Sequence, residues 1–159
     1  MRALSIKQPW ADFILQGRKS IETRLWRAIP RIEYPETIAI HTGRETDVNA
    51  IHWFATKGRD IPYLHIPGSF PVGALLGLVT IVGCTVYSCH AQFEKDFDAH
   101  LSQTPIPPED YNFVGASKVL GLQLKNPRRL IEPIRWKGAL GFFDIGYINW
   151  MDDPCAFSA

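Results

Sequence analysis

One apolar run constrains the fold more than any other part of the sequence. It reads VGALLGLVTIVGCTVY, over residues 72–87, and is rich in β-branched residues. Gly73, Gly77 and Gly83 interrupt it, and it is too short for a membrane-spanning helix, which takes ~20 residues. Glycines inside a β-branched strand are typical of a strand that bends at a barrel corner. The run therefore predicts a long, bent core strand over residues 74–87.

Shorter segments with strand-like patterns surround this run. They alternate apolar with polar residues or are rich in β-branched and aromatic residues, and turn residues bound them. The segments are RALSI, KSIETRLW, ETIAIHTG, SKVLGLQLKNP, RRLIEPI and GFFDI. A basic turn is expected between SKVLGLQLKNP and RRLIEPI.

Helices are expected beside the strands. Pro9 suits a first helical turn and Gly17 supplies a stop, with Phe13 and Ile14 on one face between them. TDVNAIHWFATKG is a second helix, and AQFEKDFDAHL is a short acidic one. The proline-rich segments RDIPYLHIPGSFPVG and TPIPPEDYNFVGA are predicted loops. Together these patterns predict an α+β fold, a small β-barrel with two or three flanking helices.

Composition fits a single cytoplasmic domain. A length of 159 residues with 46% hydrophobic content allows one domain with a core. The cysteines, Cys84, Cys89 and Cys155, are too few for a disulfide framework, which fits a reducing compartment. No signal peptide is expected, because the chain does not open with a long apolar stretch. Cys84, Cys89 and His90 lack a second cluster, so buried thiols and a surface histidine are expected rather than a zinc site.

Basic residues are unevenly distributed, although the formal net charge is only +1. Segments 1–31 and 118–137 hold most of the 17 Lys and Arg residues but few acidic ones, namely Asp12, Glu22 and Glu132. If folding brings these two segments onto one face, that face would attract a polyanion. Chance clustering on an ordinary surface is the alternative.

The segment GRKSIETR, residues 17–24, crowds opposite charges just after a helix stop. Residues two apart in a strand share a face, so Glu22 and Arg24 should point the same way, with Lys19 at the strand entrance. Lys19 is then placed to bind phosphate as a point charge, and Arg24 to make a forked contact to phosphate or a guanine edge. An ion pair of Glu22 with Arg24 or Lys19 that stabilises the barrel is the alternative.

Several segments resemble the ASCH domain (activating signal cointegrator homology) family. Its signature, Gly-x-Lys-x-x-Glu-x-Arg, is matched by Gly17, Lys19, Glu22 and Arg24, and the lead-in LSIKQPWADFIL is similar to that of the family. Further along, TIAIHTG, LLGLVTIVGC, and LQLKNPRRL followed by IRWKGALGFFDI resemble the later strands of the family in the same order. The resemblance covers about residues 3–146.

The resemblance implies an ASCH-like domain over residues 1–146, followed by a C-terminal tail over residues 147–159. It implies a barrel similar to the pseudouridine-synthase-associated (PUA) RNA-binding fold, with a groove between the barrel and the first helix lined by Lys19, Glu22 and Arg24. The family is associated with binding RNA or other nucleic acid. We therefore expect a nucleic-acid-binding protein that favours RNA or single strands and uses no cofactor or metal ion.

Candidate nucleic-acid-binding residues surround the expected groove. Trp10 either packs the first helix on the barrel, the commoner fate, or stacks on an unpaired base, which is worth ~1–3 kcal/mol. His41 is either a structural histidine or a site residue near the signature. The basic turn, with Arg129, and Trp136 are either solvated surface or part of the second basic segment. The full set is Lys7, Gln8, Trp10, Lys19, Glu22, Arg24, His41, Lys125, Asn126, Arg128 and Lys137.

Two further functions stay open. Some small members of the family hydrolyse amide groups on modified cytidine, and nuclease activity has been proposed for others. A small hydrolase acting on a modified nucleoside or on RNA is therefore one alternative, with Lys19 and Glu22 as candidate acid–base residues. The amide-hydrolysing members carry a threonine where this chain has Glu22, which puts the same chemistry in doubt. A protein-interaction module in transcription regulation is the other alternative.

Overall fold

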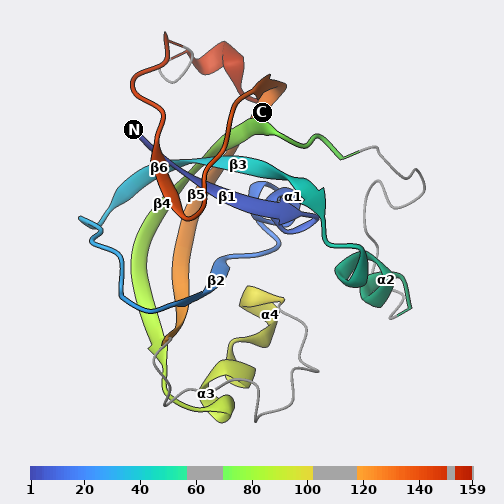
Figure 1. Cartoon of the computed structure of the whole chain (residues 1–159), viewed down its shortest axis with the longest axis vertical. Coiled ribbons are helices and arrows are strands. Elements are labelled where there is room, and N and C mark those ends of the chain that lie inside the picture. Colours follow the sequence, from blue (N-terminus) through green and yellow to red (C-terminus); the bar gives the residue numbers. More distant parts are fainter. Residues whose placement is uncertain (57–69, 102–117, 150–152, 159) are drawn as a thin grey trace.

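The computed structural model describes residues 1–56, 70–101, 118–149 and 153–158, and the structural statements below refer to those residues. They form a mixed α+β fold, in which short helices flank one strongly curved six-stranded sheet (Figure 1). The strands are β1 (Arg2–Gln8), β2 (Ile21–Trp26), β3 (Glu36–Thr46), β4 (Ala74–Tyr87), β5 (Lys118–Arg135) and β6 (Phe142–Asp144). The helices are α1 (Trp10–Leu15), α2 (Val48–Thr56), α3 (His90–Lys95), α4 (Phe97–His100) and a 3-10 helix (Pro154–Ala156).

The strand order of the sheet is β2-β5-β4-β3-β1-β6. Strands β1 and β3 run parallel, and every other neighbouring pair is antiparallel. The predicted core strand is confirmed as β4, whose first half is almost continuously buried. The parallel register sets Ser5 of β1 beside His41 of β3, and this pairing positions the centre of the site described below.

The expected barrel does not close through backbone pairing, because β2 and β6, at the two ends of the strand order, are not neighbours in the ladder. Side chains of β2 contact the β1–β6 end of the sheet instead. The rings of Trp26 on β2 and Phe142 on β6 lie 5.7 Å apart between centroids, and Arg24 Nη2 donates a hydrogen bond to the Ser5 carbonyl on β1 at 2.6 Å. The short β6 offers only three residues for pairing, and bulky rings occupy the gap.

The expectation of two strands separated by a basic turn is wrong, because β5 runs unbroken from Lys118 to Arg135. Its register against β4 slips between Lys125 and Arg128, and Asn126 takes a left-handed conformation with φ of 51°. This is a β-bulge, which leaves a residue outside the ladder and therefore tolerates Pro127, which has no N–H to donate. The basic residues at this point lie on a bulged strand rather than in a turn.

The helices cover part of the sheet and close a second small core. Phe13 and Ile14 of α1 are buried as expected; Ile14 packs on the sheet, while Phe13 meets Phe54 of α2 and Leu101. The predicted acidic helix divides at Asp96 into α3 and α4. Most of the first predicted loop and all of the second lie outside the described residues.

Other expectations concern the cysteines, the tail and membrane spans. Cys84 is half-buried and Cys89 is exposed just ahead of α3, so the expectation of two buried thiols is wrong. In the predicted tail, Phe157 packs on the sheet and bridges to Leu130 of β5. None of the described helices has the length and apolar character that crossing a bilayer requires.

Candidate functional site

The signature lysine is enclosed by the protein. Lys19 is only 2% exposed, and its Nζ donates hydrogen bonds to the carbonyl oxygens of Ile21, at 2.8 Å, and His100, at 2.5 Å. The Glu22 carboxylate lies 3.4 Å away. Burial lowers the pKa of the Lys19 ammonium, and the charge of Glu22 partly opposes that effect. Because α4 supplies one of the carbonyls, Lys19 sits inside the fold rather than on an open groove.

Glu22 and Arg24 extend this ionic contact toward β1. Glu22 is 5% exposed, and its Oε1 lies 3.0 Å from Arg24 Nε without the alignment of a hydrogen bond. The half-buried Arg24 also donates to the Ser5 carbonyl. The three signature side chains therefore form one connected network, the signature network (Lys19, Glu22 and Arg24), which ends on the backbone of Ser5.

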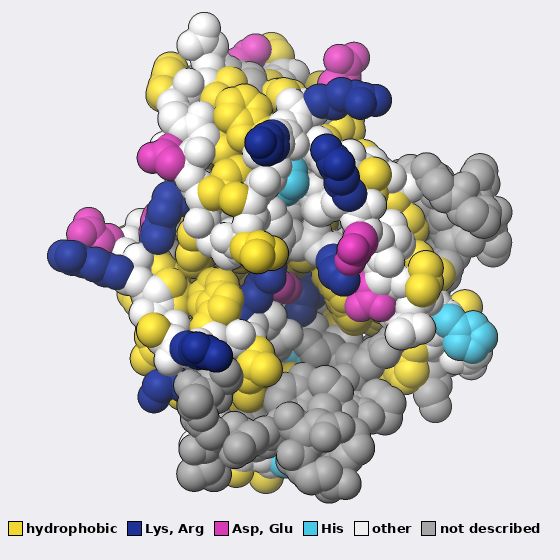
Figure 2. Space-filling view, in the orientation of Figure 1, with side chains coloured by type: hydrophobic (Ala, Val, Ile, Leu, Met, Phe, Trp, Pro, Cys, Tyr) yellow, Lys and Arg dark blue, Asp and Glu magenta, His cyan; other side chains and the backbone are white. Residues whose placement is uncertain are grey.

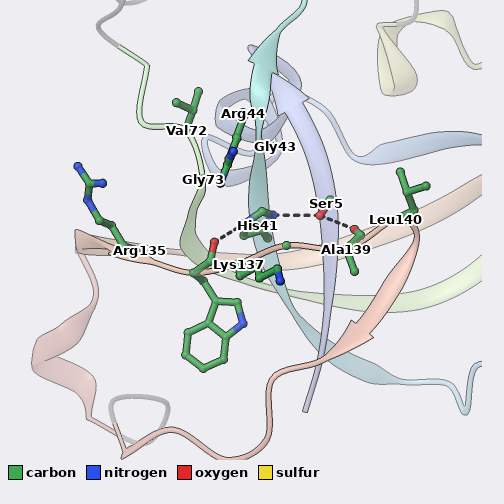
Figure 3. Close-up of a pocket in the computed structure, with 12 residues that line it drawn as sticks. Ser5, His41, Gly43, Arg44, Val72, Gly73, Arg135, Lys137, Ala139 and Leu140 are labelled. Carbon is green, nitrogen blue, oxygen red and sulfur yellow. Dashed lines mark hydrogen bonds between the residues drawn. The ribbon is translucent and has the colours of Figure 1, made fainter.

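The side chain of Ser5 belongs to a second hydrogen-bonded group on the sheet. Ser5 Oγ lies 3.0 Å from His41 Nδ1, and it donates to the Ala139 carbonyl at 2.8 Å. His41 Nε2 lies 3.1 Å from the Trp136 carbonyl. His41 is almost completely buried, and burial lowers its pKa. Figure 3 shows Ser5 between His41 and Ala139, so this group ties β1 and β3 to residues 136–139.

A pocket of about 1020 Å³ opens over this group. Arg44 at the end of β3, Arg135 at the end of β5, and Lys137 contribute to its lining together with Ser5 and His41 (Figure 3). No carboxylate among the described residues pairs with any of these three cations. We call this site the cationic pocket; its volume is sufficient for a nucleotide-sized ligand.

The cationic pocket differs in charge from the surface around it. Figure 2 shows Lys and Arg side chains spread over one face of the molecule, several with acidic side chains beside them. Lys7, for example, lies 2.9 Å from Glu45. A single continuous basic face therefore does not form on this side. Other described cations without a carboxylate partner, such as Lys118 and Lys125, stand elsewhere, but the pocket gathers three of them around one cavity.

Two predicted ligand residues near the first helix have structural partners. The Trp10 ring makes edge contacts with Phe13 and Phe54, at 6.1 and 5.5 Å between centroids, and its Nε1 donates to Asp47 at 3.1 Å. Gln8 is fully buried and hydrogen-bonds through its side chain to backbone atoms. Both contact sets are those of packed residues, which favours the structural interpretation of Trp10.

The structure brings only some of the predicted residues together. His41 and Lys137 meet in the cationic pocket, while Lys125, Asn126 and Arg128 do not line it. These three are exposed on the β5 bulge, where Arg128 lies over the Phe157 ring at 3.8 Å. Sequence reasoning missed three pocket residues, Ser5, Arg44 and Arg135. The available signal was weak: the two arginines stand near strand ends, and nothing in the sequence marked Ser5.

A sequence model of the ASCH domain matches residues 4–132. The chain belongs to the ASCH domain family. The ASCH domain is a PUA-like fold associated with RNA binding. In the described residues of this ASCH domain, no group of three or more His, Cys, Asp or Glu side chains is arranged to hold a metal ion.

Curated relatives and solved structures agree with this assignment. The chain is 28% identical over 137 residues to human Activating signal cointegrator 1 and 27% identical to the mouse protein, covering 85% of this chain but 20% of each relative. It thus spans about a fifth of the length of those relatives. The crystal structure of ASCH from Zymomonas mobilis superposes with a TM-score of 0.65 at 15% identity, covering 99% of this chain and 95% of that one. This last likeness concerns the fold alone.

Proposed function

We propose that this ASCH domain binds single-stranded nucleic acid, with RNA as the favoured form, and that the cationic pocket is the principal contact. The observation that carries the proposal is the presence of three cations, Arg44, Arg135 and Lys137, around one pocket without carboxylate partners among the described residues. Cations that no carboxylate neutralises are available to replace the counterions of a phosphate backbone. The RNA association of the family supports the choice of polymer.

In this proposal the signature network stabilises the backbone of Ser5, which lines the cationic pocket. Because Lys19 and Glu22 are buried, they act in this proposal by holding Arg24, and Arg24 in turn holds the Ser5 backbone at the pocket floor. Arg44 and Arg135 offer planar forks for phosphate oxygens, and Lys137 offers a point charge. Arg24 is the only one of the three signature side chains that is partly exposed, so it is the one that a bound strand could contact directly.

Salt dependence of oligonucleotide binding tests the proposal. Each neutralised phosphate of a single strand contributes roughly −0.7 to the slope of log K against log salt. The double variant Arg135→Gln/Lys137→Gln should weaken binding to a short RNA and reduce the slope magnitude by about 1.4. Lys95→Gln, which changes an exposed cation on α3, is the matched control and should alter neither quantity. The proposal would be contradicted if the wild-type chain does not bind the RNA at low salt. It would also be contradicted if the double variant binds with the same affinity as Lys95→Gln.

The hydrolase alternative centred on Lys19 and Glu22 has less support from the geometry. The lowered pKa of Lys19 suits a general base. However, two carbonyl oxygens and Glu22 enclose its Nζ. A substrate would have to displace these contacts before it reached the amine.

A further inference from the structure

Ser5 and His41 have the arrangement of a nucleophile and its base. They are direct neighbours across the parallel β1–β3 pair, and Ser5 Oγ lies 3.0 Å from His41 Nδ1. The other ring nitrogen, Nε2, lies 3.1 Å from the Trp136 carbonyl oxygen. A hydroxyl within hydrogen-bond reach of an imidazole that a third group orients is the general pattern of an activated nucleophile.

The Trp136 carbonyl determines which ring nitrogen can act as the base. A carbonyl oxygen only accepts hydrogen bonds, so His41 Nε2 must carry a proton. In the neutral ring, Nδ1 then presents its lone pair to Ser5 Oγ. Burial lowers the pKa of His41, so the neutral ring predominates near pH 7. The Ser5 hydroxyl thus has two acceptors, the Ala139 carbonyl at 2.8 Å and His41 Nδ1, and rotation toward Nδ1 prepares its deprotonation.

Neighbouring groups hold both members of the pair in place. Gly138 packs so closely on the imidazole that an added Cβ would lie 2.2 Å from His41 Cε1. The Phe143 ring meets the imidazole edge-on at 5.5 Å between centroids. On the other side, Arg24 binds the Ser5 carbonyl. The imidazole is thereby fixed while Ser5 lines the pocket, so a ligand in the pocket meets the nucleophile directly.

The charges around the pair select the substrate. The charged residues that line the pocket are Arg44, Arg135 and Lys137, and all are positive. Such groups attract an anionic substrate, and they also stabilise negative charge that develops on a carbonyl oxygen during attack. A purely structural Ser–His tie between strands would need neither an open pocket nor this excess of positive charge.

We propose that Ser5 and His41 form a catalytic pair that hydrolyses carboxylic esters carried on phosphate-bearing molecules such as nucleotides. Ser5 Oγ attacks the ester carbonyl carbon, and its proton passes to His41 Nδ1. The carbon–oxygen bond to the alcohol then breaks, and His41 returns the proton to the departing alcohol oxygen. Water releases the acid from Ser5 by the same route, so one ester and one water give one acid and one alcohol. This activity goes beyond nucleic-acid binding and does not require it.

Hydrolysis of O-acetylated adenosine monophosphate by the full chain, followed by acetate release, tests the proposal. Ser5→Ala and His41→Gln should each lower kcat/KM by about 10²–10⁴-fold, whereas Ser88→Ala, at an exposed serine ahead of α3, should not. The rate should fall in acid as His41 takes up a proton, which a structural role would not produce. Arg135→Gln should raise KM for this probe and leave KM for O-acetylated adenosine unchanged, since that probe lacks the phosphate.

Covalent labelling gives a second measurement that does not depend on the variants folding. A fluorophosphonate should modify Ser5 of the wild-type chain, identified by mass spectrometry, and Ser88 should stay unmodified. Wild-type protein that neither turns over the acetylated nucleotide nor labels at Ser5 would overturn the proposal. A folded Ser5→Ala variant with the wild-type rate would overturn it as well. Neither result would affect the salt-dependent binding test, so the two proposals fail separately.

Discussion

Replacing Glu22 with Gln removes one negative charge from the buried signature network. The carboxylate lies 3.4 Å from Lys19 Nζ and 3.0 Å from Arg24 Nε, and glutamine fills nearly the same volume. Lys19 then keeps its two carbonyl acceptors but loses its charge partner. Removing one partner of a buried ion pair typically costs about 3–5 kcal/mol, which is a large share of the roughly 5–15 kcal/mol that stabilises a domain.

The destabilisation caused by Glu22→Gln has an upper limit, because the unpaired Lys19 can lose its proton instead of remaining charged. This limit depends on pH. An ordinary lysine has a pKa of about 10.4, and each unit corresponds to about 1.36 kcal/mol, so neutralising it costs about 4–5 kcal/mol at pH 7 and about 2 kcal/mol at pH 9. Burial already lowers the pKa of Lys19, and the charge of Glu22 opposes this, so Glu22→Gln lowers it further. We expect a destabilisation of about 3–5 kcal/mol at pH 7 that shrinks to about 2 kcal/mol or less at pH 9.

Urea unfolding followed by circular dichroism at the two pH values measures this effect. The matched control is Glu45→Gln, because Glu45 contacts Lys7 at 2.9 Å in an exposed pair and should leave the free energy of unfolding essentially unchanged. Adding Lys19→Met to Glu22→Gln should recover most of the lost stability, since no buried ammonium remains. The reasoning is refuted if Glu22→Gln matches Glu45→Gln at pH 7, or if its effect does not change with pH.

Three further predictions concern stability. Acidification below about pH 6.5 should lower the urea midpoint, because burial lowers the pKa of both His41 and His100 and only the unfolded chain then takes up these protons; His100→Gln should flatten that dependence. Gly138→Ala should destabilise by about 1–3 kcal/mol, because its Cβ collides with the His41 ring, and thermal melting measures this. Asp12→Asn should lower the urea midpoint, because it breaks the 2.6 Å ion pair of the buried Asp12 with Arg129 that joins α1 to β5.

Strand β4 could be predicted from the sequence because its signal is local. Its apolar, β-branched residues and spaced glycines specify a bent core strand without reference to any partner. Strand β5 was only partly predictable, since Pro127 removes a ladder donor and favours a break. The structure keeps the strand whole because β4 offers pairing positions on both sides of the bulge, and no local pattern reports such a partner.

The candidate site shows the same limit. Alternation placed Glu22 and Arg24 on one face of a strand, and the two side chains do meet there. Whether that face meets solvent depends on α4, whose His100 carbonyl binds the Lys19 amine across 81 positions of sequence. Ser5 carried no signal of its own, because its role arises from the parallel register that sets it beside His41.

The cationic pocket draws on both ends of the chain, and this affects when it can exist during synthesis. The Ser5 side chain hydrogen-bonds to the Ala139 carbonyl, 134 residues further along the chain, and the His41 side chain hydrogen-bonds to the Trp136 carbonyl, 95 residues further along. When the ribosome has synthesised β1 and β3, Ser5 and His41 are present, but residues 136–139, whose carbonyl oxygens orient the two side chains, are not. In the unfinished domain the cationic pocket is therefore not assembled. Only chains translated past Ala139 acquire it.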